Sequence, residues 1–269
     1  MLAELRDAPR GPIPRIAIVT PSHNYAQYIA SAIDSVLAQN YPNLSYHVQD
    51  GGSSDGTLEV LKNYGDRISW SSQVDGGQSH AINAGFAAND SDLMAYLNSD
   101  DMFLPGALAY VARFFEANPD VDLIYGHRIF IDRSQAEIGR AILPAHDSGA
   151  LYFAAYIPQE TMFWRRRVWE AVGPIDEGFQ YAMDWEFQLR AQKAGFKFAR
   201  VNRFLACFRV HDQQKTSATY DIGHAEMQTL RKRYLGHSPG RRELLWALLP
   251  YLTKQYAYHL LYNMRVLRI

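Results

Sequence analysis

The chain has 269 residues, of which 48% are hydrophobic and 20% are charged, and its formal net charge is −1. This composition is typical of one large soluble domain, with or without an appendage, and the near-zero charge gives no electrostatic footprint for nucleic acid. The single cysteine, Cys207, excludes an internal disulfide and a thiolate metal cluster.

Residues 1–14 contain three prolines and no apolar stretch of signal-peptide length. We therefore expect a poorly ordered leader and no export signal. With a single cysteine, the protein is expected in the reducing cytoplasm. No apolar run reaches the roughly 18 residues that are needed to span a bilayer.

Between residues 15 and 97 the sequence alternates between short β-branched runs and patterns of helical period. Strands are expected at 15–20, 45–49, 68–72 and 92–97, and helices at 29–37, 58–64 and 79–87, the last with Ser79 as its cap. This alternation is typical of an α/β protein with a mostly parallel sheet and helices on both faces. Polar residues, many of them acids and glycines, follow the strands at the carboxyl edge, where open α/β sheets bind ligands.

Two adjacent acids follow the last of these strands, in the segment Asn98-Ser99-Asp100-Asp101. Neighbouring side chains on a strand point to opposite sides, so the two carboxylates can have different roles. One can ligate a hard divalent cation such as Mg²⁺ between phosphate oxygens, and the other can accept hydrogen bonds from sugar hydroxyls. Taken alone, the pair is equally consistent with a solvated turn.

The second half of the sequence is less regular. A helix is expected at 105–117, a strand pair at 123–125 and 129–132, a mobile flap at 133–157, a strand at 161–164 and a helix at 167–172. The triplet Arg165–Arg167 is expected to be a solvated helix start rather than a phosphate site, because three consecutive cations cannot share one face.

Asp184 begins a helical pattern that runs to Ala194, and His211 follows strands expected at 196–201 and 204–210. A carboxylate at a helix start is stabilised by the helix dipole, so Asp184 is either a cap or a general base presented by a rigid helix end. His211 is either structural or a ligand. A Rossmann site and a P-loop are disfavoured, because no GxGxxG follows the first strand and no GxxxxGKS/T occurs.

Six motifs within residues 16–217 resemble, in order, those of the family 2 inverting glycosyltransferases, which have the GT-A fold. They are TPSHN at 20–24, DGGSSDGT at 50–57, DGGQSHAINAG at 75–85, NSDD at 98–101, MDWEF at 183–187 and RVHDQQKTS at 209–217. The resemblance implies a GT-A catalytic domain at 15–217. Its nucleotide-binding half would be 15–104 and its acceptor half 105–217, before a C-terminal helical extension at 218–269.

The resemblance also implies roles for individual residues. Asp184 would be the general base, Asp101 the carboxylate at a Mn²⁺ or Mg²⁺ ion, and His211 a group that approaches the metal or the diphosphate. The nucleotide and donor sugar would contact Thr20, Pro21, Asn24, Asp50, Asp75, Gln78, Asn98 and Asp100. Two positions depart from the family pattern: Met183 replaces the glutamate usual before the base, and His80 replaces an aspartate common in close relatives.

The implied reaction moves a sugar from a UDP-, GDP- or dTDP-linked donor to a hydroxyl of a glycan or lipid-linked acceptor, in polysaccharide, lipopolysaccharide or glycolipid synthesis. Two alternatives are a metal-dependent nucleotidyltransferase and an inactive sugar-nucleotide-binding module. Release of diphosphate would indicate the first. The presence of Asp100, Asp101 and Asp184 argues against the inactive binding module.

The segment beyond residue 217 has a different character. A helix is expected at 225–234 and a break at 238–240, and residues 244–269 are rich in Leu, Trp and Tyr. From residue 241 onward there are five cations and one acid. A basic aromatic helix of this kind lies in a membrane interface, here the inner face of the plasma membrane, or packs on the catalytic domain or on a second subunit of a homodimer.

Overall fold

The computed structural model describes residues 12–269 except 88, 213, 215–219 and 268, so most of the predicted leader lies outside the described residues. The first part of the chain forms β1 (Ile16–Ser22), α1 (Ile29–Leu37), β2 (Leu44–Asp50), α2 (Thr57–Asn63), η1 (Gly65–Arg67), β3 (Ser69–Ser72), α3 (Gln78–Ala87), β4 (Leu93–Tyr96), β5 (Met102–Phe103) and α4 (Ala107–Ala117). The second part forms β6 (Leu123–Ile131), β7 (Glu137–Ala141), α5 (Ser148–Leu151), η2 (Gln159–Thr161), β8 (Phe163–Arg165), α6 (Arg166–Val172), α7 (Met183–Lys193), β9 (Phe198–Arg209), α9 (Tyr220–Leu235) and α10 (Arg241–Asn263).

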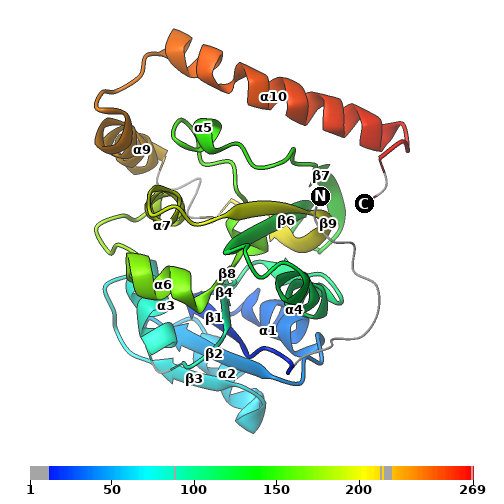
Figure 1. Ribbon diagram of the computed structural model, residues 1–269. Coiled ribbons are helices and arrows are strands. Elements are labelled where there is room, and N and C mark those ends of the chain that lie inside the picture. The colour runs from blue at the N-terminus through cyan, green and yellow to red at the C-terminus, as the bar shows by residue number, and fades with distance from the viewer. Residues whose placement is uncertain (1–11, 88, 213, 215–219, 268) are drawn as a thin grey trace.

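The described strands form one sheet in the order β3-β2-β1-β4-β8-β6-β9-β5, with β7 paired to β6. The strands β3, β2, β1 and β4 are parallel to one another, and β8 is antiparallel to both β4 and β6. The predicted α/β class is therefore confirmed, and the sheet is parallel in its first half and mixed in its second (Figure 1).

Helices cover both faces of the sheet because both faces of its central strands are apolar. Ile16 and Ile18 of β1 pack with residues of α1, α2 and α4, whereas the alternate residues Ala17 and Val19 pack with residues of α3, α6 and α7. Helix α3 approaches β1 closely at Gly85, where a Cβ would lie 2.5 Å from Val19 Cγ1. This contact fixes α3 and therefore the loop before it.

Three local predictions were wrong. The segments 123–125 and 129–132 belong to one strand, β6, and the segments 196–201 and 204–210 to one strand, β9, because the two strands pair with each other along their length through register shifts. Ser79 is not a cap: it lies inside α3, and its hydroxyl donates to the Phe179 carbonyl at 3.2 Å.

The arginine triplet lies at the start of α6, as predicted, but only Arg167 is exposed, and Arg165 and Arg166 are half-buried. Arg165 pairs in register with Leu93 at the start of β4, and its guanidinium donates to the carbonyls of Val121, Phe115 and Asn118. Arg166 donates to the Ser91 carbonyl at 2.6 Å. The triplet therefore closes the amino edge of the sheet, where loop carbonyls would otherwise lack donors.

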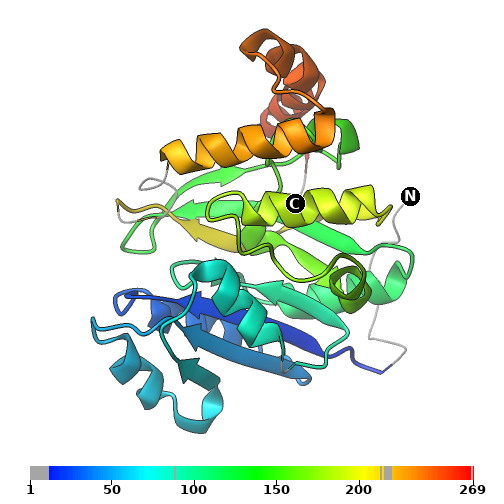
Figure 2. The same cartoon turned by 90° about the vertical axis from the view of Figure 1, so that its left-hand side faces the viewer.

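The predicted C-terminal extension consists of two helices, α9 and α10, which follow one another around the second half of the sheet (Figure 2). Pro250 lies inside α10. Among the described residues, no helix is both long enough and apolar enough to cross a bilayer.

Candidate active site

A cavity of about 780 Å³ lies at the carboxyl edge of the parallel strands. The segments that follow β1, β2, β3 and β4 contribute one wall, through residues 21–23, Gly51, residues 74–78 and residues 98–101. The opposite wall comes from residues 155–160 and from the loop and first turn of α7, residues 179–184. The cavity thus brings together seven of the predicted site residues: Pro21, Asp75, Gln78, Asn98, Asp100, Asp101 and Asp184.

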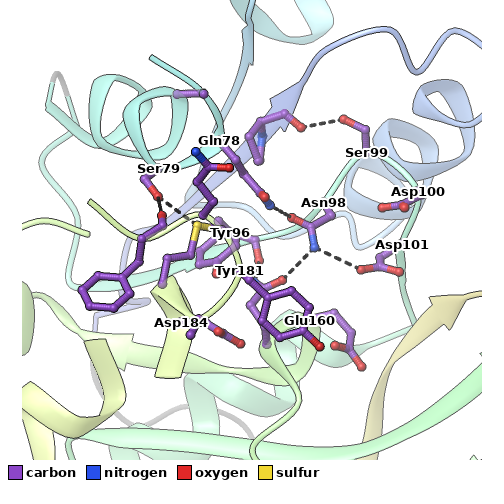
Figure 3. Close-up of a pocket in the computed structure, with 18 of the residues that line it drawn as sticks. Gln78, Ser79, Tyr96, Asn98, Ser99, Asp100, Asp101, Glu160, Tyr181 and Asp184 are labelled. Carbon is purple, nitrogen blue, oxygen red and sulfur yellow. Dashed lines mark hydrogen bonds between the residues drawn. The ribbon is translucent and has the colours of Figure 1, made fainter. Parts of the chain in front are cut away.

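Asn98 is the centre of a hydrogen-bond network that joins the two walls (Figure 3). Its Oδ1 accepts from Gln78 Nε2 at 2.7 Å, and its Nδ2 donates to Gln159 Oε1 at 3.1 Å. Gln159 Nε2 donates in turn to the Tyr96 carbonyl at 2.7 Å, at the end of β4. The network holds the Asn98–Asp101 segment rigidly against the end of its own strand.

The two adjacent acids lie in the turn between β4 and β5 and not on a strand as predicted, but their environments differ. Asp101 is 1% exposed, and its Oδ1 accepts from the backbone amide of Arg209 at 3.0 Å. Burial raises the pKa of the Asp101 carboxyl well above its usual range, and the charges of Asp100 and Glu160 raise it further. Asp100 has a side chain that is 13% exposed, and its Oδ2 lies 3.0 Å from His211 Nε2.

The predicted metal set of Asp101 and His211 stays a prediction, and the two residues have different surroundings. His211 is buried, contacts Asp100 rather than Asp101, and does not line the cavity. With Asp100 ionised, the hydrogen of the imidazole is on Nε2, because a carboxylate only accepts. Both acids line the cavity, but Asp100 is the more exposed of the two and is oriented by a neighbour, whereas Asp101 is almost fully buried.

Asp184 lies on the other side of the cavity from Asp100, in the first turn of α7 (Figure 3). The N-cap position belongs to Ala182, so the alternative in which Asp184 is only a cap is not supported. Its Oδ1 accepts from the amide of Trp185 at 2.8 Å. The helix dipole favours a negative charge at this position.

The segment before α7 is held by helix α9, which sequence reasoning assigned to an extension outside the site. Glu226 of α9 accepts hydrogen bonds from the amides of Gln180, Tyr181 and Ala182 at 2.7–2.8 Å. Gly223 lies directly against the Tyr181 ring, because a Cβ at this glycine would be 2.7 Å from that ring. Figure 2 shows α9 alongside α7. Helix α9 therefore fixes where the Asp184 turn sits.

We expect Glu226→Ala to lower the free energy of unfolding by about 2 kcal/mol, because three amides lose a charged acceptor. Transfer activity should fall roughly tenfold, since small displacements of reacting groups are costly. Glu226→Gln, which keeps one acceptor oxygen, should give a smaller loss of both. Asp221→Asn, an exposed acid in the same helix, is the matched control. Unchanged stability and activity in Glu226→Ala would contradict the anchoring role.

Two cavity residues escaped sequence reasoning. Glu160 is 2% exposed and pairs with Arg128 at 3.4 Å. Tyr96 is fully buried, and its hydroxyl has no hydrogen-bond partner among the described residues. Burial raises the pKa of the Tyr96 phenol well above its ordinary value, and the charges of Asp184 and Glu160 add to the effect. The only sequence signal was the acid and amide pair Gln159-Glu160 directly before an apolar run.

Three of the predicted donor-site residues do not line the cavity. Thr20 is buried and lies 3.1 Å from the Tyr46 hydroxyl. Asp50 accepts from the amides of Gly52 and Ser53 and from two serine hydroxyls. Asn24 has φ 58°, and its Oδ1 accepts from the Ser54 amide. These residues shape the loops behind the cavity wall.

The two residues that depart from the family pattern both contact other side chains. Met183 is buried, lines the cavity, and its Sδ lies 3.0 Å from the Ser79 hydroxyl. His80 of α3 lies 3.3 Å from Glu177, which Asn83 also contacts at 3.0 Å. The first contact joins α3 to the first residue of α7, and the second joins α3 to the segment that precedes α7.

The model of the family described as Glycosyl transferase family 2 matches residues 17–182, more than half of the chain. The chain belongs to this family. It is 30% identical over 175 residues to an uncharacterized glycosyltransferase of Nostoc sp. (strain PCC 7120), a match that covers 60% of this chain and 54% of that relative. It is 28% identical over 182 residues to a PGL/p-HBAD biosynthesis glycosyltransferase of Mycobacterium bovis (strain BCG), covering 66% of this chain and 69% of that relative.

Solved structures similar to this family 2 chain share its fold. Staphylococcus aureus TarS in complex with UDP-GlcNAc superimposes with a TM-score of 0.67 at 15% identity, covering 91% of this chain and 73% of that one. The mannosyltransferase PcManGT of Pyrobaculum calidifontis, in complex with GDP-Man and Mn²⁺, has a TM-score of 0.63 at 15% identity, covering 92% of this chain and 70% of that one. The predicted GT-A type of fold is confirmed.

Proposed function

We propose that the protein is an inverting glycosyltransferase that moves a sugar from a nucleotide-diphosphate donor to an acceptor hydroxyl. The observation that carries the proposal is the cavity itself, with Asp184 on one wall and Asp100 on the other. One carboxylate sits at a helix start that favours negative charge, and the other sits at the edge of the parallel strands, where nucleotides bind in open α/β sheets.

The reaction is a single displacement at the anomeric carbon of the donor. The acceptor oxygen forms a bond to that carbon, the bond from the carbon to the diphosphate oxygen breaks, and the hydroxyl proton passes to Asp184 as general base. The nucleoside diphosphate leaves with the electrons of the broken bond. Attack from the face opposite the leaving group inverts the anomeric configuration. The nucleotide-binding half is 15–104, and the acceptor half is 105–217.

The residues at Asp100 fit a divalent cation. The carboxylate is a hard oxygen ligand at the cavity wall, and His211 orients it from behind, as outer-shell partners of metal ligands do. The described residues contain no cluster of three His, Cys, Asp or Glu side chains, so phosphate oxygens and water would complete the coordination, which suits Mg²⁺ and Mn²⁺. When bound, the cation neutralises charge on the departing diphosphate.

The relatives support a nucleotide-sugar donor and a role in the synthesis of a polysaccharide, lipopolysaccharide or glycolipid. The structures of the similar proteins contain UDP-GlcNAc in one case and GDP-Man with Mn²⁺ in the other. One curated relative is named for PGL/p-HBAD biosynthesis. We place the reaction in the cytoplasm, at the hydroxyl of a glycan or a lipid-linked acceptor.

A donor screen tests the proposal. The unfolding temperature of the protein is measured with UDP-, GDP- and dTDP-sugars, each with Mn²⁺ or Mg²⁺ and with chelator. One donor should raise the unfolding temperature in the presence of metal, since a ligand at about 100 times its Kd adds about 2.7 kcal/mol to the free energy of unfolding. With that donor and an acceptor, the product should be nucleoside diphosphate. Release of inorganic diphosphate would instead indicate nucleotidyl transfer, and no shift with any donor would favour an inactive module.

A further inference from the structure

Helix α10 packs on the second half of the sheet through one face only. The Tyr251 ring on this face is 3% exposed and lies 4.3 Å from the Tyr156 ring, centroid to centroid. The Arg200 guanidinium lies over the Tyr258 ring at 5.5 Å, and Lys254 approaches Asp147 at 3.6 Å. Aromatic and charged side chains make these contacts, and the apolar side chains of Leu244 and Leu248 are half-buried as well.

The outward face of α10 carries exposed apolar side chains. Leucines and a tyrosine recur there at helical spacing, all of them exposed: Leu245, Leu249, Leu252, Tyr256 and Leu260. Trp246, which is 72% exposed, and Met264 border this stripe. In Figures 1 and 2, α10 lies at the end of the molecule farthest from β3, and no other part of the described chain covers its outward side. At 1.5 Å per residue the stripe from Leu245 to Leu260 is about 23 Å long, and an exposed apolar stripe of that length indicates an interaction surface.

The charges around the stripe are of one sign. Arg241 and Arg242 are exposed at the start of α10, and Arg265 is exposed just beyond its end. The single acid beyond residue 240, Glu243, lies 2.7 Å from His237. The rest of the chain is slightly acidic, because the overall net charge is −1 while residues 241–269 carry five cations and one acid. The cations therefore gather at the ends of the apolar stripe.

We propose that the outward face of α10 docks on an anionic lipid surface and holds the enzyme at a membrane without crossing it. Leucine, tryptophan and tyrosine side chains on one face enter the boundary between headgroups and acyl chains, and flanking arginines bind anionic headgroups. Tyr156, against which Tyr251 packs on the inner face, also lines the cavity. Docking thus brings the lipid surface to within about one helix diameter, roughly 10 Å, of the cavity wall.

Vesicle flotation of the full chain tests this proposal. The protein should float with vesicles in which about a third of the phosphatidylcholine is replaced by phosphatidylglycerol, and less with phosphatidylcholine alone or at high salt. Trp246→Ser with Leu249→Ser should weaken partitioning about tenfold or more, because two inserted apolar side chains are lost. Both residues are exposed, so the unfolding temperature should not change. Ile138→Ser, at an exposed apolar residue of β7, is the matched control and should float like the original chain.

Two outcomes overturn the proposal. The first is equal flotation of the original chain and the double variant, or no flotation of either. The second is a concentration-dependent dimer in lipid-free solution that light scattering detects for the original chain and not for the double variant, because a second copy would then be the occupant of this face.

Discussion

Asp184→Asn should lower the rate of sugar transfer about a thousandfold, within the range by which a general base accelerates a reaction. The amide has nearly the same shape and can still accept the hydrogen bond from the Trp185 amide, so α7 should keep its first turn. Donor binding should stay within about twofold of the original chain, because the nucleotide is expected on the opposite wall of the cavity. Transfer is measured as nucleoside diphosphate release, and binding by calorimetry.

The control for this variant is Asp66→Asn, which changes an exposed acid in η1, outside the cavity. Its activity should match that of the original chain. If Asp184→Asn loses donor binding as well as transfer, or if its unfolding temperature falls strongly, the carboxylate has a structural role and the base must be sought elsewhere. Glu160 would then be the next candidate, because it lines the same cavity.

Asp100→Asn should abolish the effect of metal on donor binding and lower transfer by about a hundredfold or more, because a cation at the diphosphate supplies several kcal/mol of charge stabilisation. Both acids line the cavity, but Asp100 is the more exposed and contacts His211, whereas Asp101 is buried and accepts from the Arg209 amide. Donor affinity is measured with added Mn²⁺, with added Mg²⁺ and with chelator.

Asp101→Asn is the informative comparison for that result. It keeps an acceptor for the Arg209 amide, and burial already favours the uncharged form of Asp101 by raising its pKa. This variant should keep the metal response of donor binding. If Asp101→Asn loses the response and Asp100→Asn keeps it, the metal assignment made from the sequence is correct and the one made from the structure is not.

The sequence indicated the edge of the sheet at which the cavity lies, because the signals for that edge are local. The hydrophobic period alone locates the end of each strand, and acids and glycines follow these ends in the sequence. Because the strands are parallel, these residues lie at one edge of the sheet. Thr20, Asn24 and Asp50 show the limit of this reasoning. Thr20 and Asp50 lie near the carboxyl ends of β1 and β2, and Asn24 lies in the loop after β1, yet their side chains hydrogen-bond within the protein and do not line the cavity. The direction of a side chain in a loop depends on φ and ψ, which residue type alone does not give.

Contacts between segments far apart in the chain could not be predicted from the sequence. Glu226 lies 44 to 46 residues from the three amides it binds, and the Asn98 side-chain amide donates to Gln159 across 61 residues. Each of these residues is an ordinary polar residue in its own local context. Only the packing of α9 on α7, and of residues 155–160 on the end of β4, gives them a role at the cavity.

By itself, the amino-acid sequence determined the α/β alternation, the strand-end acids, Asp184 at a helix start and an apolar, basic C-terminal helix, because each is a pattern within about 20 neighbouring residues. The tertiary structure alone decided which of two adjacent acids is the more exposed, that His211 contacts Asp100, and that α9 anchors the turn that contains Asp184. It also decided which side of α10 is left uncovered. These outcomes depend on which segments pack against one another in the folded chain, because this packing determines which groups are buried and which hydrogen-bond partners they have.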